Sequence, residues 1–264
     1  MIGALVGDIV GSIYERDNIK TTDFPLFQKQ CRFTDDSVLT VALADAILTD
    51  TPYEVKLREY FERYPQAGYG RGFREWAESH NPGPYNSSGN GSGMRISPAG
   101  WAFDTLEDVL EKAKVFTAVT HNHPEGIKGG QAVSAAIFLG RTGSGKQEIR
   151  KYIEENFAYD LSKNCDLIRP DYRFDRTAQG TVPQAIIAFL DSSDFENAIR
   201  LAVSLGGDTD TLACITGSIA EAFYAGVPDY IQVQALDFLD EPLRQVTFRF
   251  IERFMGRKIP DLKS

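Results

Sequence analysis

Apolar positions along this chain recur with the spacing of α-helices. The stretch DDSVLTVALADAIL (35–48) is apolar almost all round, as in a buried helix, and its start, TDDS, is rich in N-cap residue types. The stretch PYEVKLREYFERY (52–64) pairs opposite charges at helical spacing. The same reading predicts further helices at residues 99–114, 126–140, 146–157, 179–190, 194–205, 210–225, 229–239 and 241–254.

Strand patterns are nearly absent from the sequence. It holds no alternating runs joined by hairpin turns and no βαβ rhythm. These patterns predict an all-α fold. The number of helices exceeds that of a four-helix bundle, so we expect a compact globular packing of roughly ten or more helices.

One long stretch breaks the helical pattern. Residues 81–98, NPGPYNSSGNGSGMRISP, contain four glycines and three prolines and cannot form a regular element. Long irregular stretches inside compact chains are usually functional loops or linkers. The chain has 264 residues, which suits one large domain or two small ones. Composition alone leaves both organisations open.

Charge and cysteine content narrow the class of protein. The net charge of −9 argues against a nucleic-acid footprint, which needs a basic face, and fits partners that are small molecules or basic surfaces. The three cysteines form neither a disulfide framework nor a CxxC metal site. The N-terminal stretch is a poor signal peptide, and no apolar run is long enough for a membrane span. We therefore expect a cytoplasmic protein.

Two helix starts carry paired acidic residues. FTDDS (33–37) presents Asp35 and Asp36, and SLGGDTDT (204–211) presents Asp208 and Asp210. One such site would be explained as a helix start favoured by the macrodipole. Two sites, flanked by the hydroxyls of Thr34, Thr209 and Thr211, make an oxygen-only ligand set that suits Mg²⁺, Mn²⁺ or Ca²⁺. Four carboxylates balance two divalent ions, but spacing alone does not show that the two clusters meet.

Three other motifs have competing interpretations. GRTGSGK (140–146) fits a P-loop, yet Gln147 stands where Ser or Thr is needed and no strand precedes it; SGKQ (144–147) fits a helix capping box instead. THNHP (120–124) could open a zinc site, but a histidine that is hydrogen-bonded within the fold or contacts substrate is favoured in a chain without strands. SSGNGSGMR (87–95) offers backbone amides that can form an anion-binding nest.

Taken in order, these blocks resemble the ADP-ribosylglycohydrolase family. The resemblance covers nearly the whole chain, which favours one domain over residues 1–264. The matching blocks are GALVGDIVGSIYE (3–15), FTDDS (33–37), GNGSGMR (89–95), THNHPEGIKGGQAV (120–133), GTVPQAI (180–186) and SLGGDTDTLACITGSIA (204–220). The family usually reads FTDDT, so Ser37 is a mild departure.

The resemblance implies a fold, a cofactor and a set of site residues. The family is all-helical and holds two Mg²⁺ or Mn²⁺ ions between the FTDD and GGDTDT helices, so it implies a dinuclear metal cleft. By position the implied metal ligands are Thr34, Asp35, Asp36, Asp208, Asp210 and Thr211. A serine-directed branch of the family carries a glutamate where Glu15 stands, near the metals. In that branch the loop matching Ser87, Ser88, Gly89, Asn90 and Gly91 holds the diphosphate, the histidine matching His121 lines the same cleft, and Tyr85 matches an aromatic residue that stacks on adenine.

The activity implied is hydrolysis of a glycosidic bond to ADP-ribose. The substrate would be an ADP-ribosylated protein side chain or a small ADP-ribosyl compound. Glu15, Asp35 or Asp36 would orient or deprotonate the attacking water, or protonate the leaving group, through an oxocarbenium-like transition state. Arginine, serine and O-acetyl linkages all remain open. Two alternatives are an inactive ADP-ribose-binding relative and a two-metal hydrolase of another phosphate compound.

Overall fold

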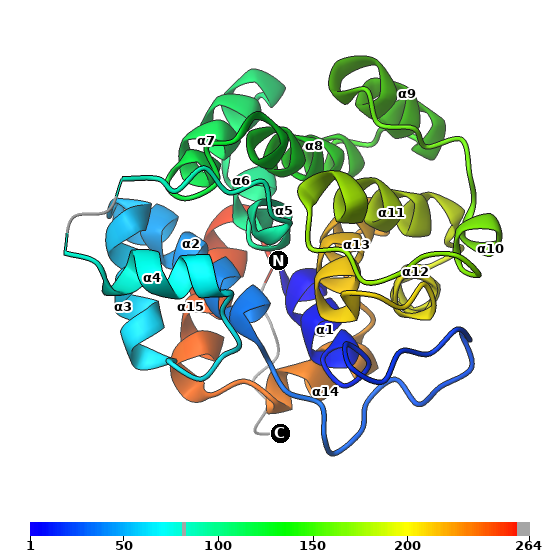
Figure 1. The fold of residues 1–264 in the computed structure, drawn as a ribbon, viewed down its shortest axis with the longest axis horizontal. Helices are drawn as coiled ribbons and strands as arrows, with labels where there is room; N and C mark the ends of the chain where they lie inside the picture. The colour runs from blue at the N-terminus through cyan, green and yellow to red at the C-terminus, as the bar shows by residue number, and fades with distance from the viewer. Residues whose placement is uncertain (81–82, 258–264) are drawn as a thin grey trace.

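Two helices from opposite parts of the sequence lie side by side at the middle of the molecule (Figure 1). They are α1 (Ile2–Gly11) and α13 (Thr209–Phe223) in a computed structural model that describes residues 1–80 and 83–257. Every residue of α1 is buried, and so is all of α13 except its last residue, Phe223. A helix that is apolar on all sides belongs in a core, and these two form the centre around which the others pack.

Small residues allow the backbones of α1 and α13 to touch. Gly3, Gly7 and Gly11 recur at every fourth position and therefore lie on one face of α1. A Cβ atom added at Gly7 would lie 2.0 Å from the carbonyl oxygen of Ala213, and one at Gly3 would lie 2.1 Å from that of Gly217. No side chain larger than hydrogen fits at these contacts. This close approach places the C-terminal part of α1 beside the start of α13.

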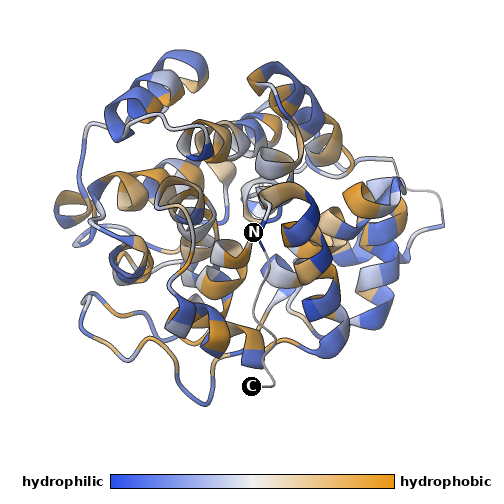
Figure 2. Ribbon diagram, turned by 180° about the vertical axis from the view of Figure 1, so that it is seen from behind, coloured by the Kyte–Doolittle hydropathy of each residue, from blue (hydrophilic) through white to orange (hydrophobic). Residues whose placement is uncertain are grey.

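The remaining helices surround this pair (Figure 1). In chain order they are α2 (Asp35–Thr49), α3 (Tyr53–Arg63), α4 (Arg71–Glu78), α5 (Gly91–Met94), α6 (Ser97–Ala102), α7 (Leu106–Ala118), α8 (Pro124–Arg141), α9 (Lys146–Phe157), α10 (Cys165–Ile168), α11 (Ala178–Asp191), α12 (Phe195–Ser204), α14 (Asp229–Asp237) and α15 (Glu241–Met255). Helices at the edge of the molecule alternate hydrophilic and hydrophobic stretches, as expected of elements buried on one side (Figure 2).

The expectation of an all-α fold with ten or more helices is confirmed, and three details differ. The described residues form 15 helices and one isolated antiparallel bridge, between Gly89 and Thr177. The helix expected over 99–114 is two helices, because Thr105 accepts a hydrogen bond from the Asp108 amide and starts α7. The pattern also missed α1, α4 and the short helices α5 and α10. Helix α5 and the start of α6 lie inside the stretch 81–98, so the expectation that this stretch forms no regular element was wrong. Residues 81 and 82 of the stretch fall outside the described chain.

Two smaller expectations concern the cysteines and membrane spans. All three cysteines, Cys31, Cys165 and Cys214, are unpaired and buried. No helix in the described part of the chain combines the length and hydrophobicity needed to cross a membrane.

Candidate functional site

The first element of the site is a carboxylate that the sequence reading did not single out. Asp8 on α1 is fully buried and faces the start of α2. It accepts hydrogen bonds from the backbone amides of Thr34 (2.8 Å) and Ser37 (3.1 Å) and from both of their hydroxyl groups. Asp8 therefore fixes the start of α2 to α1. Ser37, read from sequence as a mild departure, supplies two of these four donors.

The aspartates at the two helix starts do little helix capping. Thr34 is the N-cap of α2 and accepts from the amide of Asp36, while Asp208, the N-cap of α13, makes no capping hydrogen bond. Among the described residues, Asp210 accepts only from the adjacent amide of Thr211, at 3.0 Å. Their carboxylate oxygens are thus left for other partners, which weakens the explanation by helix capping alone.

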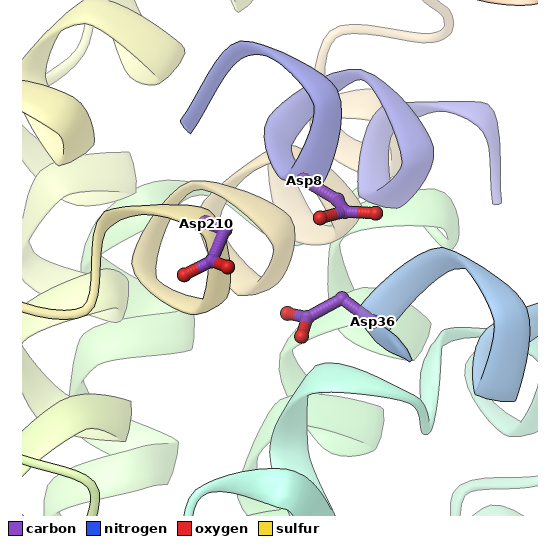
Figure 3. A group of neighbouring side chains, drawn as sticks. All are labelled: Asp8, Asp36 and Asp210. Atoms are coloured by element: carbon purple, nitrogen blue, oxygen red, sulfur yellow. The ribbon is translucent and has the colours of Figure 1, made fainter. Parts of the chain in front are cut away.

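Carboxylates from three helices converge at one point. Oxygen atoms of Asp8, Asp36 and Asp210 all lie within 4.8 Å of one another, and the three side chains point toward a shared space (Figure 3). The Oδ1 atom of Asp36 is buried and has no hydrogen-bond partner among the described residues. An unpaired buried carboxylate oxygen is costly unless a cation satisfies it. The residues therefore fit a divalent metal ion with oxygen ligands.

A second group of carboxylates adjoins the first. Oxygens of Glu15, Asp208 and Asp210 also lie within 4.8 Å of one another, so Asp210 belongs to both groups. Two acidic groups that share one carboxylate are the arrangement expected of a two-metal site. The structure thus brings together the helix starts that are far apart in sequence, and it adds Asp8 to them.

The other expected ligands lie around these two groups. Thr34, Asp35 and Thr211 line the same cleft, although Asp35 belongs to neither group of converging oxygens. Thr34 directs its hydroxyl to Asp8 at 2.6 Å, and Thr211 directs its hydroxyl to the sulfur of Met94. Thr209, one of the three hydroxyl candidates, instead donates to the carbonyl of Gly11 and ties α13 to α1.

Burial makes the ionised form of these carboxylates unfavourable. The pKa values of Asp36 and Asp210 are raised well above normal, first by burial and then by the neighbouring carboxylates. Burial, followed by the charge of Asp8, raises the pKa of Asp35 to about 7. Like charges held together without a cation disfavour ionisation. We therefore expect folding to favour the protonated form of these carboxyls in the metal-free protein.

This cluster predicts an unusual pH dependence for the metal-free protein. A carboxyl whose pKa is raised by folding binds more protons in the folded state, so stability falls as pH rises between the unfolded and the folded pKa. Melting temperatures measured in chelator should rise when pH is lowered from 8 to 7. The gain is on the order of 1.4 kcal/mol for each carboxyl that stays protonated in the folded protein across that range. Saturating metal should remove the effect; a flat profile in chelator would contradict it.

The glycine-rich loop forms the wall next to the acidic cluster. The amide of Asn90 donates to the carbonyl of Arg176 at 2.8 Å, and Gly89 bridges to Thr177, so the loop is fixed to the segment before α11. The side-chain amide of Asn90 donates to Asp208 at 2.7 Å. Asn90, expected from the resemblance at the diphosphate, thus links the loop directly to an acidic helix start.

One cleft of about 630 Å³ joins the cluster to the loop. It is lined by Glu15 and by every residue expected to bind substrate except Ser88, whose carbonyl accepts from the amide of Ala178. The rings of Tyr85 and His121 lie 6.0 Å apart across this wall. The cleft is also lined by residues that the sequence reading did not single out: Arg16, Arg32, Arg176 and the segment 66–73, which ends in the first turn of α4. Arg95, the last residue of the stretch SSGNGSGMR, lines the cleft as well.

The P-loop interpretation of 140–146 is not supported by the contacts of its lysine. The ammonium group of Lys146 donates to the carbonyls of Leu190 and Ser192 at the C-terminal end of α11, and Lys146 does not line the cleft. The capping expectation was nearly right but shifted by one residue: Gly145 is the N-cap of α9, and its amide donates to Glu148 at 2.7 Å.

Of the two histidines in 120–124, His121 lines the cleft, whereas His123 accepts from the amide of Glu125 and caps α8.

Comparison with known proteins gives a consistent result along the chain. Residues 1–259 match the family model described as ADP-ribosylglycohydrolase. The chain is similar to the ADP-ribosylhydrolase ARH3 of Bos taurus, with 25% identity over 309 residues that cover 85% of this chain and 83% of the relative. It is also similar to the ADP-ribosylarginine hydrolase Tri1 of Pseudomonas putida (strain GB-1), with 24% identity over 265 residues that cover 86% and 71%. A solved chain of an ADP-ribosylglycohydrolase-related protein complex shares the fold, with a TM-score of 0.69, 23% identity and coverage of 94% and 96%.

Proposed function

The chain belongs to the ADP-ribosylglycohydrolase family of glycosidase-type hydrolases, and from this premise we propose that it is metal-dependent and releases ADP-ribose. Its substrate would be ADP-ribose joined by an N- or O-glycosidic bond to a protein side chain or a small acceptor. The observation that carries the proposal is the single cleft in which Glu15 and the carboxylates at the starts of α2 and α13 adjoin a glycine-rich loop. The family match over residues 1–259 supports a single domain. The three cysteines are unpaired, as is usual in the reducing cytoplasm, and this supports a cytoplasmic location.

We propose two divalent cations, Mg²⁺ or Mn²⁺, as cofactors. The ligands would come from Thr34, Asp35, Asp36, Asp208, Asp210 and Thr211. The unpaired oxygen of Asp36 and the sharing of Asp210 between two acidic groups support this set. Asp8 would chiefly orient the start of α2, because four donors already occupy its oxygens. Bound cations would supply Lewis acidity at the distal ribose.

The protein's own groups would position the substrate and move protons. Glu15, Asp35 or Asp36 would take a proton from the attacking water or deliver one to the leaving atom. Glu15 is the best placed of the three, since it is partly exposed in the cleft beside Asp208 and Asp210. The amides around Gly89 and Gly91 would hold the diphosphate, and Tyr85 would contact the adenine. The loop amides and Tyr85 would position the substrate. Proton transfer would be the role of the carboxylates.

The test is a panel of arginine-, serine- and O-acetyl-linked ADP-ribose, incubated with and without Mg²⁺ or Mn²⁺. Mass spectrometry of the products separates three functions. Free ADP-ribose formed only with metal supports the proposal. No product together with measurable ADP-ribose affinity supports an inactive binding relative. Release of phosphate supports a hydrolase of a different class.

Substitution of Gly91 by valine tests the role of the loop. A Cβ atom at Gly91 would lie 3.0 Å from Nε2 of His121, so a larger side chain must fill the space beside the loop amides. We expect Gly91→Val to weaken ADP-ribose binding at least tenfold, measured by calorimetry, with little change in melting temperature. Gly83→Val is the matched control, because a Cβ atom there meets nothing within 4 Å. Equal affinity in the two variants would remove the loop from the binding site.

A further inference from the structure

A buried arginine lies behind the glycine-rich loop. Arg95 is only 1% exposed, yet it lines the cleft. Among the described residues no carboxylate lies within ion-pair distance of its guanidinium group, which instead sits 5.7 Å from the ring of Tyr53. A buried charge without an opposite charge is costly. Such a group is a candidate for a role at the site it lines.

The polar contacts of Arg95 lead to His121. Its Nη2 atom donates to the hydroxyl of Thr120 and lies 3.4 Å from Nδ1 of His121. The hydroxyl of Thr120 lies 2.8 Å from the same Nδ1 atom. The Thr120 carbonyl accepts from the amide of Ser87, so this group is tied to the loop itself.

The hydrogen-bond donors around Nδ1 favour one tautomer of His121. A guanidinium group can only donate, so the Thr120 oxygen accepts from Arg95. The one proton of the Thr120 hydroxyl is then available for Nδ1 of His121. Nδ1 faces two donors and can accept only when it carries no proton. Only the tautomer with its proton on Nε2 lets Nδ1 accept from both Arg95 and Thr120.

The Nε2 atom faces the loop. A Cβ atom at Gly91 would lie 3.0 Å from Nε2 and one at Gly89 would lie 3.5 Å from it. No residue in the described part of the chain accepts a hydrogen bond from Nε2. Burial, followed by the charge of Arg95, also lowers the pKa of His121, so the ring stays neutral. A neutral N–H donor thus points to the place where an anionic ligand would lie.

We propose that Arg95 and Thr120 are positioning residues that hold His121 as its Nε2–H tautomer, which donates a hydrogen bond to a diphosphate oxygen of the ligand. This inference rests on the proposed function, since it takes ADP-ribose as the ligand. His121 then contributes to binding and not to proton transfer. Its Nδ1 atom already accepts hydrogen bonds from Thr120 and Arg95, and its ring is neutral and therefore has no extra proton to donate.

Nuclear magnetic resonance of the full chain labelled with ¹⁵N-histidine tests the tautomer directly. The chain has three histidines, and the spectrum of His121→Gln identifies the signal of His121. We expect Nε2 to carry the proton in the ligand-free protein. His123 is an internal reference, since its Nδ1 accepts from the amide of Glu125 at 3.1 Å. A proton on Nδ1 of His121, or on both nitrogens, would overturn the proposal whether or not ADP-ribose is a ligand.

Two substitutions at Thr120 separate positioning from a structural role. Thr120→Val removes the hydroxyl at similar volume and should lower the affinity for ADP-ribose and for ADP roughly tenfold, with a mixture of tautomers at His121. Thr120→Ser restores the hydroxyl and should restore both. Equal behaviour of the two variants, with the wild-type tautomer in each, would reject the role of Thr120. A loss seen for ADP-ribose but not for ADP would reject the diphosphate as acceptor.

Discussion

Asp210→Asn is expected to reduce both the metal-induced stabilisation and the activity strongly while leaving the metal-free protein at least as stable as the wild type. Asp210 belongs to both acidic groups, so the change removes one negative charge from each at nearly constant volume. Metal that binds only the folded state adds about 2.7 kcal/mol at a concentration 100 times its Kd. The variant should gain much less than that, and its hydrolase activity should fall by orders of magnitude.

Melting curves in chelator and in Mn²⁺ or Mg²⁺ decide this prediction. The matched control is Asp194→Asn, because Asp194 starts α12 and accepts from the amide of Asn197 at 2.8 Å in an ordinary cap. The control should keep the full metal-induced shift. If Asp210→Asn instead melts clearly lower in chelator and keeps its metal shift and activity, Asp210 is a structural cap and the metal proposal fails.

Gly7→Ala is expected to destabilise the protein by about 3 kcal/mol or more, at the upper end of the range for overpacked cores. The added methyl group would lie 2.0 Å from the carbonyl oxygen of Ala213, and backbone cannot move aside as a side chain can. The sign of the change in unfolding free energy shows whether the backbone contact is present. In a helix without this contact, replacing glycine by alanine stabilises by about 0.5–1 kcal/mol.

Denaturant unfolding of the metal-free proteins measures this effect without the contribution of metal binding. Gly83→Ala serves as the control, since a Cβ atom there meets nothing within 4 Å. Its stability should change little. A Gly7→Ala variant as stable as the wild type or more stable would show that α1 and α13 are not in backbone contact. Such a result would also remove the structural reason for the closeness of Asp8 and Asp210.

Helical periodicity predicted the fold class because most helices bury one continuous face. Periodicity failed to predict elements that lack an amphipathic pattern or whose ends are set by a single hydrogen bond. Helix α1 is buried on all sides and rich in glycine, so neither propensity nor an amphipathic pattern marks it. The break between α6 and α7 depends on the single cap at Thr105. Both failures concern elements whose ends are set by individual hydrogen bonds or tertiary contacts.

The acidic residues of the site were visible in sequence, whereas their meeting was not. Paired aspartates before apolar helices gave Asp35, Asp36, Asp208 and Asp210 as candidates, and only the resemblance joined the two helix starts. Asp8 was missed because a single acidic residue within an apolar segment has no pattern; its importance comes from its hydrogen bonds to α2. Arg95 lies in the glycine-rich stretch that the sequence did mark, whereas the segment 66–73 reaches the cleft through tertiary packing.

The pairing of α1 with α13 also has a consequence for biosynthesis. Ribosomes make the N-terminal part of a chain first, and domains fold as units during synthesis. A nascent chain that stops before residue 208 carries Asp8, Asp35 and Asp36 but neither carboxylate of α13. Its glycine-bearing face on α1 has no partner, and glycine makes the isolated helix weak. The proposed cation site would therefore be complete only after the ribosome has made α13, and under the proposal cation binding would follow the synthesis of that helix.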